Sequence, residues 1–279
     1  MTKKLHLRMA GSGLNLTIYA GALQAFEEAG YEPATIAGTS GGGVIGAAWA
    51  AGMTAKEIQD LLLSFMPPAA TILDASWFPA SWFWNWGLYK MKKLQAEMGK
   101  QLKAKGVVQF KDFKTPFACF TANMQTGDLH TWASHKTPDE VVGDRVVDGT
   151  RLPVAMQPGW INGMPHRDGG LLYNFPVDFL FPDQDQSVPT IGLLFRGTAQ
   201  RGGAKIKNAL EDGFACIDLM LAATAREHIE DALWAKTIVL EPKSSGMNFL
   251  KTPEEAKEDF NNGYTAVKAW LEKNELLAS

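Results

Sequence analysis

The sequence predicts an α/β fold in which a central, mostly parallel sheet is covered by helices on both faces. Three observations favour this class. Short apolar, β-branched segments alternate with segments of helical periodicity, glycine-rich turns follow the first two predicted strands, and further apolar strands recur toward the C-terminus. Because the 279 residues contain no internal repeat, low-complexity tract or clear linker, we expect one domain over residues 1–279.

The N-terminal segment holds the clearest part of this pattern. Residues 5–9 alternate apolar and polar side chains and predict a strand that ends at Gly11-Ser12-Gly13. Residues 18–29 have the spacing of an amphipathic helix. A short apolar strand over residues 34–37 and a helix over residues 44–51 follow. Strand, helix, strand and helix in this order are typical of neighbouring parallel strands.

The later elements are less regular. We predict four strands and two helices there: strands over 115–121, 127–133, 188–195 and 236–240, and helices over 204–221 and 253–274. One uncharged stretch, residues 33–55, is long enough to cross a bilayer. Its six glycines divide it into strand, turn and helix, so we predict a buried α/β unit rather than a membrane span.

The composition bears on whether the protein binds nucleic acid and on where in the cell it is found. The net charge of −3 provides no electrostatic footprint for nucleic acid. Cys119 and Cys216 lie in apolar surroundings, which predicts two buried free thiols rather than a disulfide or a metal site. The basic N-terminus is not followed by the apolar stretch of a signal peptide. We therefore expect a cytoplasmic protein, and its oligomeric state is left open.

The main candidate for chemistry is Ser40 in the segment Gly38-Thr39-Ser40-Gly41-Gly42. It lies where a predicted strand meets a predicted helix, and a serine on such a sharp turn exposes its Oγ. Small flanking residues remove side chains that would clash there. The adjacent helix N-terminus also favours developing negative charge. A glycine-rich turn without chemistry is the alternative for this motif alone.

A second motif lies far along the chain, at Asp168-Gly169-Gly170 with the following Asn174-Phe175-Pro176. With the Gly11–Gly13 loop and the serine turn, this ordered set resembles the patatin-like phospholipases. The resemblance covers most of the chain and extends to Gly21 in the first helix and Gly263 in the last. It implies a three-layer patatin-like fold and a lipid acyl hydrolase of the phospholipase A or lysophospholipase type, with no cofactor or metal.

The resemblance also implies a serine–aspartate dyad. Ser40 would attack an ester carbonyl to form an acyl-enzyme, and Asp168 would accept its proton and later activate water. An ordinary aspartate is a weak base near neutrality, so we expect burial to raise the pKa of Asp168. Backbone N–H groups of Gly11, Ser12 and Gly13 would form the oxyanion hole.

This chain departs from the family's usual loop, Gly-Gly-Gly-x-Arg/Lys-Gly. Ser12 replaces the middle glycine, Asn15 the cation and Leu16 the closing glycine. The changes leave open slower hydrolysis, an altered substrate preference, or a lipid-binding relative without turnover. Asp148–Pro153 also differs from the family's Ala-Ser-x-x-x-Pro, which predicts different packing beside the site.

Residues 77–89 are dense in aromatic side chains and are followed by three lysines, Lys90, Lys92 and Lys93. Rings beside lysines suit a bilayer interface, and they would equally suit a lid over an acyl-chain groove. We predict peripheral membrane contact through Trp77–Tyr89. Packing in the core and contact with a protein partner are the alternatives.

Two histidines bear on competing mechanisms. A Ser–His–Asp esterase of the α/β-hydrolase type would require His228 as the base, whereas its charged sequence context favours a solvated role. His166 lies two residues before Asp168, and too few further ligands are nearby for a metal site, so we expect a structural or solvent-facing role.

Overall fold

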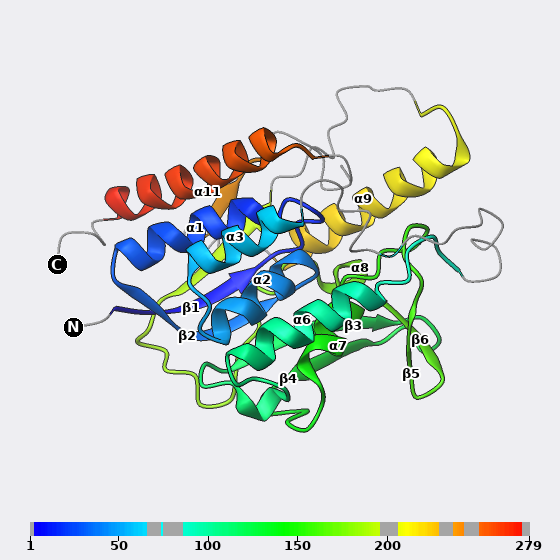
Figure 1. The fold of residues 1–279 in the computed structure, drawn as a ribbon, viewed down its shortest axis with the longest axis horizontal. Coiled ribbons are helices and arrows are strands. Elements are labelled where there is room, and N and C mark those ends of the chain that lie inside the picture. The colour runs from blue at the N-terminus through cyan, green and yellow to red at the C-terminus, as the bar shows by residue number, and fades with distance from the viewer. Residues whose placement is uncertain are drawn as a thin grey trace.

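An eight-stranded mixed sheet forms the centre of the structure (Figure 1). The computed structural model describes residues 3–65, 74, 86–195, 206–228, 237–242 and 251–274. Within them the strands are β1 (Lys3–Met9), β2 (Tyr31–Gly38), β3 (Phe117–Asn123), β4 (Leu129–Ala133), β5 (Gly159–Ile161), β6 (Met164–Asp168), β7 (Thr190–Phe195) and β8 (Thr237–Leu240). The helices are α1 (Leu16–Glu28), α2 (Gly41–Ala50), α3 (Ala55–Ser64), α6 (Lys92–Ala104), α7 (Val142–Asp148), α8 (Gly170–Tyr173), α9 (Ala209–Glu227) and α11 (Pro253–Lys273), with a 3₁₀ turn, η1, at Phe110–Asp112.

The sheet is parallel over most of its width. Its order is β5-β6-β3-β2-β1-β7-β8, with β4 paired to β3 off this path. Strands β3, β2, β1, β7 and β8 run parallel to one another. Strands β4 and β6 each pair with β3 in the antiparallel direction, and β5 pairs with β6 likewise. Parallel neighbours need crossover connections, and here those crossovers contain the helices that cover the sheet.

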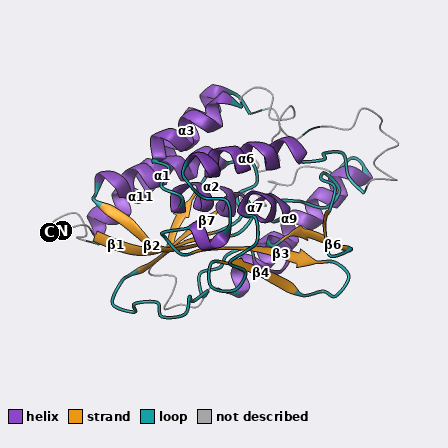
Figure 2. Ribbon diagram, turned by 60° about the horizontal axis from the view of Figure 1, so that its bottom comes forward, coloured by secondary structure: helices purple, strands orange, loops and turns teal. Residues whose placement is uncertain are grey.

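Alternate side chains of the central strands point into two different cores. On β1, Leu7 and Met9 belong to the larger core, which includes residues of α1, α2, α3, α6, α7 and α11. Figure 2 shows α2, α6 and α7 over this face of the sheet. On β3, Phe120 points the other way and packs with Tyr173 of α8. Ala225 of α9 also lies in a core on this second side. The helices therefore cover both faces, which confirms the predicted three-layer α/β class.

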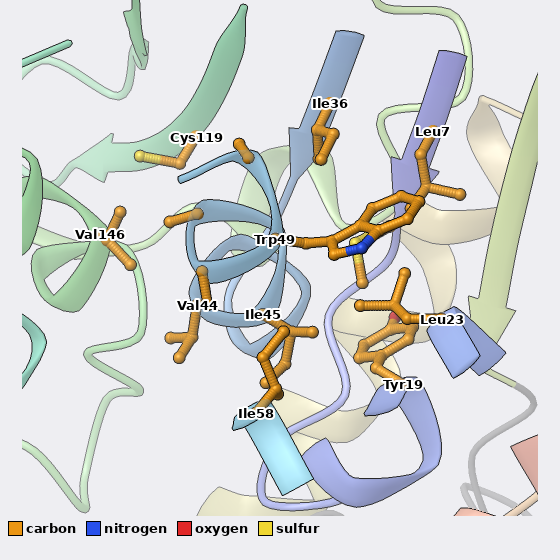
Figure 3. Close-up of a cluster of buried hydrophobic side chains, with 14 of the residues drawn as sticks. Leu7, Tyr19, Leu23, Ile36, Val44, Ile45, Trp49, Ile58, Cys119 and Val146 are labelled. Carbon is orange, nitrogen blue, oxygen red and sulfur yellow. The ribbon is translucent and has the colours of Figure 1, made fainter. Parts of the chain in front are cut away.

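Helix α2 is the centre of the larger core, and every one of its residues is buried. Figure 3 shows Trp49 of α2 lying among Leu7 of β1, Ile36 of β2 and Leu23 of α1. Full burial of a large aromatic side chain contributes about 3 kcal/mol or more to folding. Because the whole helix is buried, α2 and the serine turn at its N-terminal end are held in place.

A strand junction on β3 determines where the two catalytic candidates meet. Ala118 of β3 pairs with β2 and with β4, and Thr121 pairs with β6 and with β4. Because β4 occupies one edge of β3, strands β2 and β6 must share the other edge. They run in opposite directions along it, since β2 is parallel and β6 antiparallel to β3. Their C-terminal ends therefore meet.

Most predicted elements are present with boundaries displaced by a few residues. The predicted helix over 204–221 is the largest error, because α9 spans Ala209–Glu227 and residues 206–208 lie before it. The side chain of Asn208 caps α9 by accepting from the N–H of Glu211, which sets the helix start. The prediction for Cys216 was wrong: Cys119 is buried but Cys216 is exposed, since α9 turns Ile217 toward the core instead.

None of the helices in the described residues has a stretch long and apolar enough to traverse a bilayer. Residues 33–55 form the end of β2, the serine turn, α2 and the start of α3, as expected for a buried α/β unit.

Candidate active site

Ser40 lies on a strained turn between β2 and α2. Its backbone has φ 52° and ψ −126°, a region that L-residues with a side chain rarely adopt. Ser40 is the N-cap residue of α2, and the carbonyl of Ser40 accepts from the N–H groups of Gly43 and Val44. The turn places the hydroxyl at the positive end of a fully buried helix.

The two outer glycines of the serine motif are required by close backbone contacts. A Cβ at Gly38 would lie 2.4 Å from the carbonyl oxygen of Gly42. A Cβ at Gly42 would lie 2.5 Å from the carbonyl oxygen of Ala10. A larger residue at Gly38 would force the end of β2 away from the start of α2, and one at Gly42 would push the turn away from the end of β1. Steric fit therefore explains the glycines at positions 38 and 42, while the backbone conformation of Ser40 explains the sharp turn between them.

Asp168 reaches the same place from the opposite direction. It is the last residue of β6 and pairs with Thr121, while Gly38 at the end of β2 pairs with Cys119. The two positions on β3 are two residues apart, or about 7 Å along the strand. The structure thus brings together Ser40 and Asp168, which are 128 positions apart in the chain.

The Asp168 carboxyl is completely buried, and one of its oxygens is held in place. Oδ1 accepts from the N–H of Gly170 at 2.8 Å. Oδ2 has no hydrogen bond of normal geometry within the described residues, although the Ser40 hydroxyl is close enough to lower the pKa of the carboxyl. Catalytic hydrogen bonds are often loose before substrate binds.

Burial is the dominant influence on the Asp168 carboxyl. It raises the pKa to about 6, and the contacts with Ser40 and with the Gly170 N–H only partly oppose this. This is the direction expected from the sequence. A carboxylate with a raised pKa is a better proton acceptor near neutral pH than an ordinary aspartate, and it is still ionised there.

The glycine loop lies directly against the serine turn. A Cβ at Gly41 would lie 2.3 Å from Ser12 Oγ, and a Cβ at Gly11 would lie 3.4 Å from the Cβ of Ser40. The N–H of Gly11, however, donates to the carbonyl of Asn174 at 2.9 Å. The N–H of Gly11 is therefore not available to an oxyanion. Of the three residues predicted to form the oxyanion hole, Ser12 and Gly13 remain as candidates. Within the described residues, neither of these two donates its N–H elsewhere.

Hydrogen bonds join the serine turn, the glycine loop and the Asp-Gly-Gly segment. Thr39 donates its N–H to the carbonyl of Met9 at 3.0 Å and its hydroxyl to the carbonyl of Tyr173 at 2.8 Å. Asn174 belongs to the second motif, but the sequence assigned it no function. Its side-chain N–H donates to the carbonyl of Leu221 of α9. The segment that differs from the family also lies beside the site, since Asp168 donates its N–H to Arg151.

Both candidate histidines make their hydrogen bonds to residues other than Ser40 and Asp168. His228 follows α9, and its Nδ1 lies 3.1 Å from Asp178 while its ring packs edge-on against Tyr173. Within the described residues, no hydrogen bond joins it to Ser40. His166 is buried, and its Nδ1 pairs with the hydroxyl of Thr121. The same part of the chain contains no group of three acidic, histidine or cysteine side chains arranged to hold a metal ion.

Only the end of the predicted aromatic segment is described, because residues 77–85 lie outside the described residues. Trp86 is 53% exposed and packs edge-on against Trp160, which is 59% exposed. Arg167 of β6 donates to the carbonyl of Trp86 at 3.0 Å, which links this exposed pair to the strand that carries Asp168.

Comparison with known proteins identifies the family of the chain. The family model described as patatin-like phospholipase matches residues 7–181. The chain is 28% identical over 256 residues to the uncharacterized protein YqhO of Bacillus subtilis, an alignment that covers 79% of this chain and 81% of the relative. The chain belongs to the patatin-like phospholipase family.

Solved structures share the fold at low sequence identity. VipD from Legionella pneumophila has a TM-score of 0.58 at 15% identity, with 98% of this chain and 67% of that chain covered. A chain from the SpcU–ExoU complex of Pseudomonas aeruginosa has a TM-score of 0.58 at 16% identity, with 100% and 53% covered. This protein thus spans about half the length of the latter chain.

Proposed function

We propose that this protein is a lipid acyl hydrolase of the phospholipase A or lysophospholipase type, with Ser40 as nucleophile and Asp168 as base. One observation carries the proposal: the Ser40 hydroxyl lies against a buried carboxyl whose Oδ2 has no other partner in the described residues. The family to which the chain belongs supports a lipid ester as substrate.

The first half of the reaction forms an acyl-enzyme. Ser40 Oγ adds to the ester carbonyl carbon while its proton passes to Asp168. The N–H groups of Ser12 and Gly13 donate to the oxyanion, an interaction worth about 3 kcal/mol of barrier for each well-placed donor. The ester C–O bond then breaks, and Asp168 returns the proton to the departing alcohol oxygen.

The second half releases the fatty acid. Asp168 removes a proton from water, and the resulting hydroxide adds to the acyl carbon. The bond to Ser40 Oγ breaks, and the proton returns from Asp168 to that oxygen. Both halves use the same carboxyl as base and then as acid, so a pKa of about 6 serves both roles better than an ordinary aspartate would.

Fatty-acid release from defined phospholipids, lysophospholipids and soluble esters tests this proposal. Ser40→Ala should reduce turnover to background, and Asp168→Asn should lower kcat by about 10²–10⁴-fold. Ser64→Ala, which removes a hydroxyl at the end of α3, and Asp128→Asn, on an exposed turn, are matched controls that should retain wild-type turnover. Vesicle binding by the wild type with no turnover of any ester would favour the lipid-binding alternative.

His228→Ala separates the dyad from a Ser–His–Asp triad. The dyad predicts nearly unchanged kcat, because His228 pairs with Asp178. Loss of turnover in His228→Ala, in a protein that remains folded, would support the triad instead.

Peripheral membrane contact through Trp77–Tyr89 is part of the same proposal. The exposed, paired Trp86 and Trp160 support it, since tryptophan side chains partition into bilayer interfaces. Trp86→Ala with Trp160→Ala should weaken sedimentation with phosphatidylcholine vesicles and leave hydrolysis of a soluble ester unchanged. Equal vesicle binding by wild type and variant would contradict this assignment.

A further inference from the structure

Lys251 places a buried positive charge beside the glycine loop. Its side chain is 4% exposed, and Nζ donates to Asn15 Oδ1 at 2.7 Å and to the carboxylate of Asp259. Asn15 and Asp259 are each 1% exposed. Lys251 lies just before α11, Asp259 lies on α11, and Asn15 is the N-cap residue of α1, so the ammonium connects the start of α11 to the glycine loop before α1.

Asn15 in turn determines the shape of the loop. Its N–H donates to the carbonyl of Ser12 at 3.2 Å, which closes the turn that contains Ser12 and Gly13. Its side chain makes no capping hydrogen bond to α1, although asparagine is a common N-cap residue. The amide oxygen faces Lys251 instead. A displacement of Asn15 would therefore move the carbonyl of Ser12 and the peptide units next to it.

The charge of Lys251 also lies where the loop itself has none. Residues 10–17 contain no charged side chain, and Asn15 stands where the resemblance to the patatin-like family implies a cation. In the folded chain, Lys251, which lies 236 residues further along the sequence, donates a hydrogen bond to Asn15. Because Asp259 pairs with the ammonium, Lys251 acts on the loop by fixing the position of Asn15 rather than by adding a net positive charge.

We propose that Lys251 is a positioning residue for the oxyanion loop, which it holds in place through its hydrogen bond to Asn15. This inference rests on the proposed function. The competing role is purely structural: Lys251 would only join the start of α11 to Asp259. The two roles differ in what happens when the whole ion pair is removed.

The double variant Lys251→Met/Asp259→Asn removes both charges and avoids leaving either one buried alone. Thermal melting and circular dichroism establish that the variant is folded. The positioning role predicts that kcat for a soluble ester falls about tenfold or more, with KM nearly unchanged, because misplaced donors act on the transition state. A folded double variant with wild-type kcat would overturn the inference.

Moving the cation provides an independent test. Lys251→Asn alone should lower kcat, and adding Asn15→Lys, which returns a cation to the loop beside Asp259, should recover part of the loss. A merely structural pair predicts that the second substitution lowers activity further. Recovery supports the inference, and further loss counts against it.

Wild-type turnover separates this inference from the proposed function. If the wild type hydrolyses no ester and Ser40 is unreactive toward a fluorophosphonate, the proposed function fails and this inference fails with it. If the wild type is active and the Lys251 variants match it in kcat, only the role of Lys251 is refuted.

Discussion

Gly38 and Asp168 are held two positions apart along one edge of β3, at the ends of strands that run toward each other. This relationship places the Ser40 hydroxyl, two residues beyond Gly38, beside the Asp168 carboxyl. A rigid sheet, rather than a loop, therefore sets the geometry of the proposed dyad, which favours precise alignment of the reacting groups.

The pH dependence of turnover should follow the Asp168 carboxyl. Burial raises its pKa to about 6, and only the ionised form accepts the proton of Ser40. We predict that kcat/KM for a soluble ester is half-maximal near pH 6, falls about tenfold per unit below that, and is level from pH 7 to 8. His228→Ala should leave this profile in place. A midpoint near pH 4 would indicate that the carboxyl is not desolvated in the working enzyme.

The same pKa shift makes Asp168 a destabilising residue at neutral pH. Its pKa is higher in the folded than in the unfolded chain, so the folded state binds the proton more tightly, and stability is lost as pH rises from about 4 through about 6. Asp168→Asn should therefore raise the free energy of unfolding at pH 7.5 by up to about 3 kcal/mol, with little change at pH 4. Urea denaturation at both pH values measures this, and Asp128→Asn should show no such pattern. A variant less stable than wild type at pH 7.5 would refute the prediction.

The strained backbone of Ser40 should also be measurable as stability. At φ 52° and ψ −126°, a residue with a Cβ is disfavoured and glycine is not. Ser40→Gly and Ser40→Ala both remove the hydroxyl, but only glycine relieves the strain. We predict that Ser40→Gly is more stable than Ser40→Ala by about 1 kcal/mol in urea denaturation. Equal stability of the two variants would show that the turn is not strained.

Helices α1 and α11, which lie side by side in Figure 1, touch through two glycines. A Cβ at Gly21 would lie 1.9 Å from the carbonyl oxygen of Phe260, and a Cβ at Gly263 would lie 1.9 Å from that of Ile18. Gly263→Ala should therefore force the helices apart and destabilise the protein by about 1–3 kcal/mol.

Gly99 of α6 is the matched control for this prediction, since nothing lies within 4 Å of a Cβ there. Gly99→Ala should stabilise the protein by about 0.5–1 kcal/mol, because alanine is the better helix former. Stabilisation by Gly263→Ala as well would mean that the two helices are not in contact in solution.

Sequence reasoning could predict the α/β class because its signals are local. Apolar periodicity and glycine turns identified β1, α1, β2 and α2 to within a few residues. Strand β6 carries few of the usual signals, since Pro165, His166 and Arg167 read as a polar turn. Its place in the sheet depends on pairing with β3, which lies more than 40 residues earlier. Helices α6 and α7 were not predicted. The buried residues of α6, Met98 and Leu102, are too few to stand out, and α7 is only seven residues long.

Sequence motifs identified Ser40 and Asp168, but they did not identify the residues that fix the structure around these two side chains. The N–H of Gly11 is taken by Asn174, a long-range contact that no local pattern reveals. Lys251 belongs to no motif, and its relation to Asn15 exists only in the folded chain. The burial that raises the pKa of Asp168 could be expected from the chemistry, yet its source is the packing of several distant segments.

The most direct test is to identify the residue that reacts with a fluorophosphonate. Tryptic mapping by mass spectrometry should find the phosphonyl adduct on Ser40 in the wild type and no adduct in Ser40→Ala. Labelling of Asp168→Asn should be slower by about two orders of magnitude or more, because the proton acceptor is missing. An adduct on another serine, or equal labelling rates in wild type and Asp168→Asn, would contradict a Ser40–Asp168 dyad.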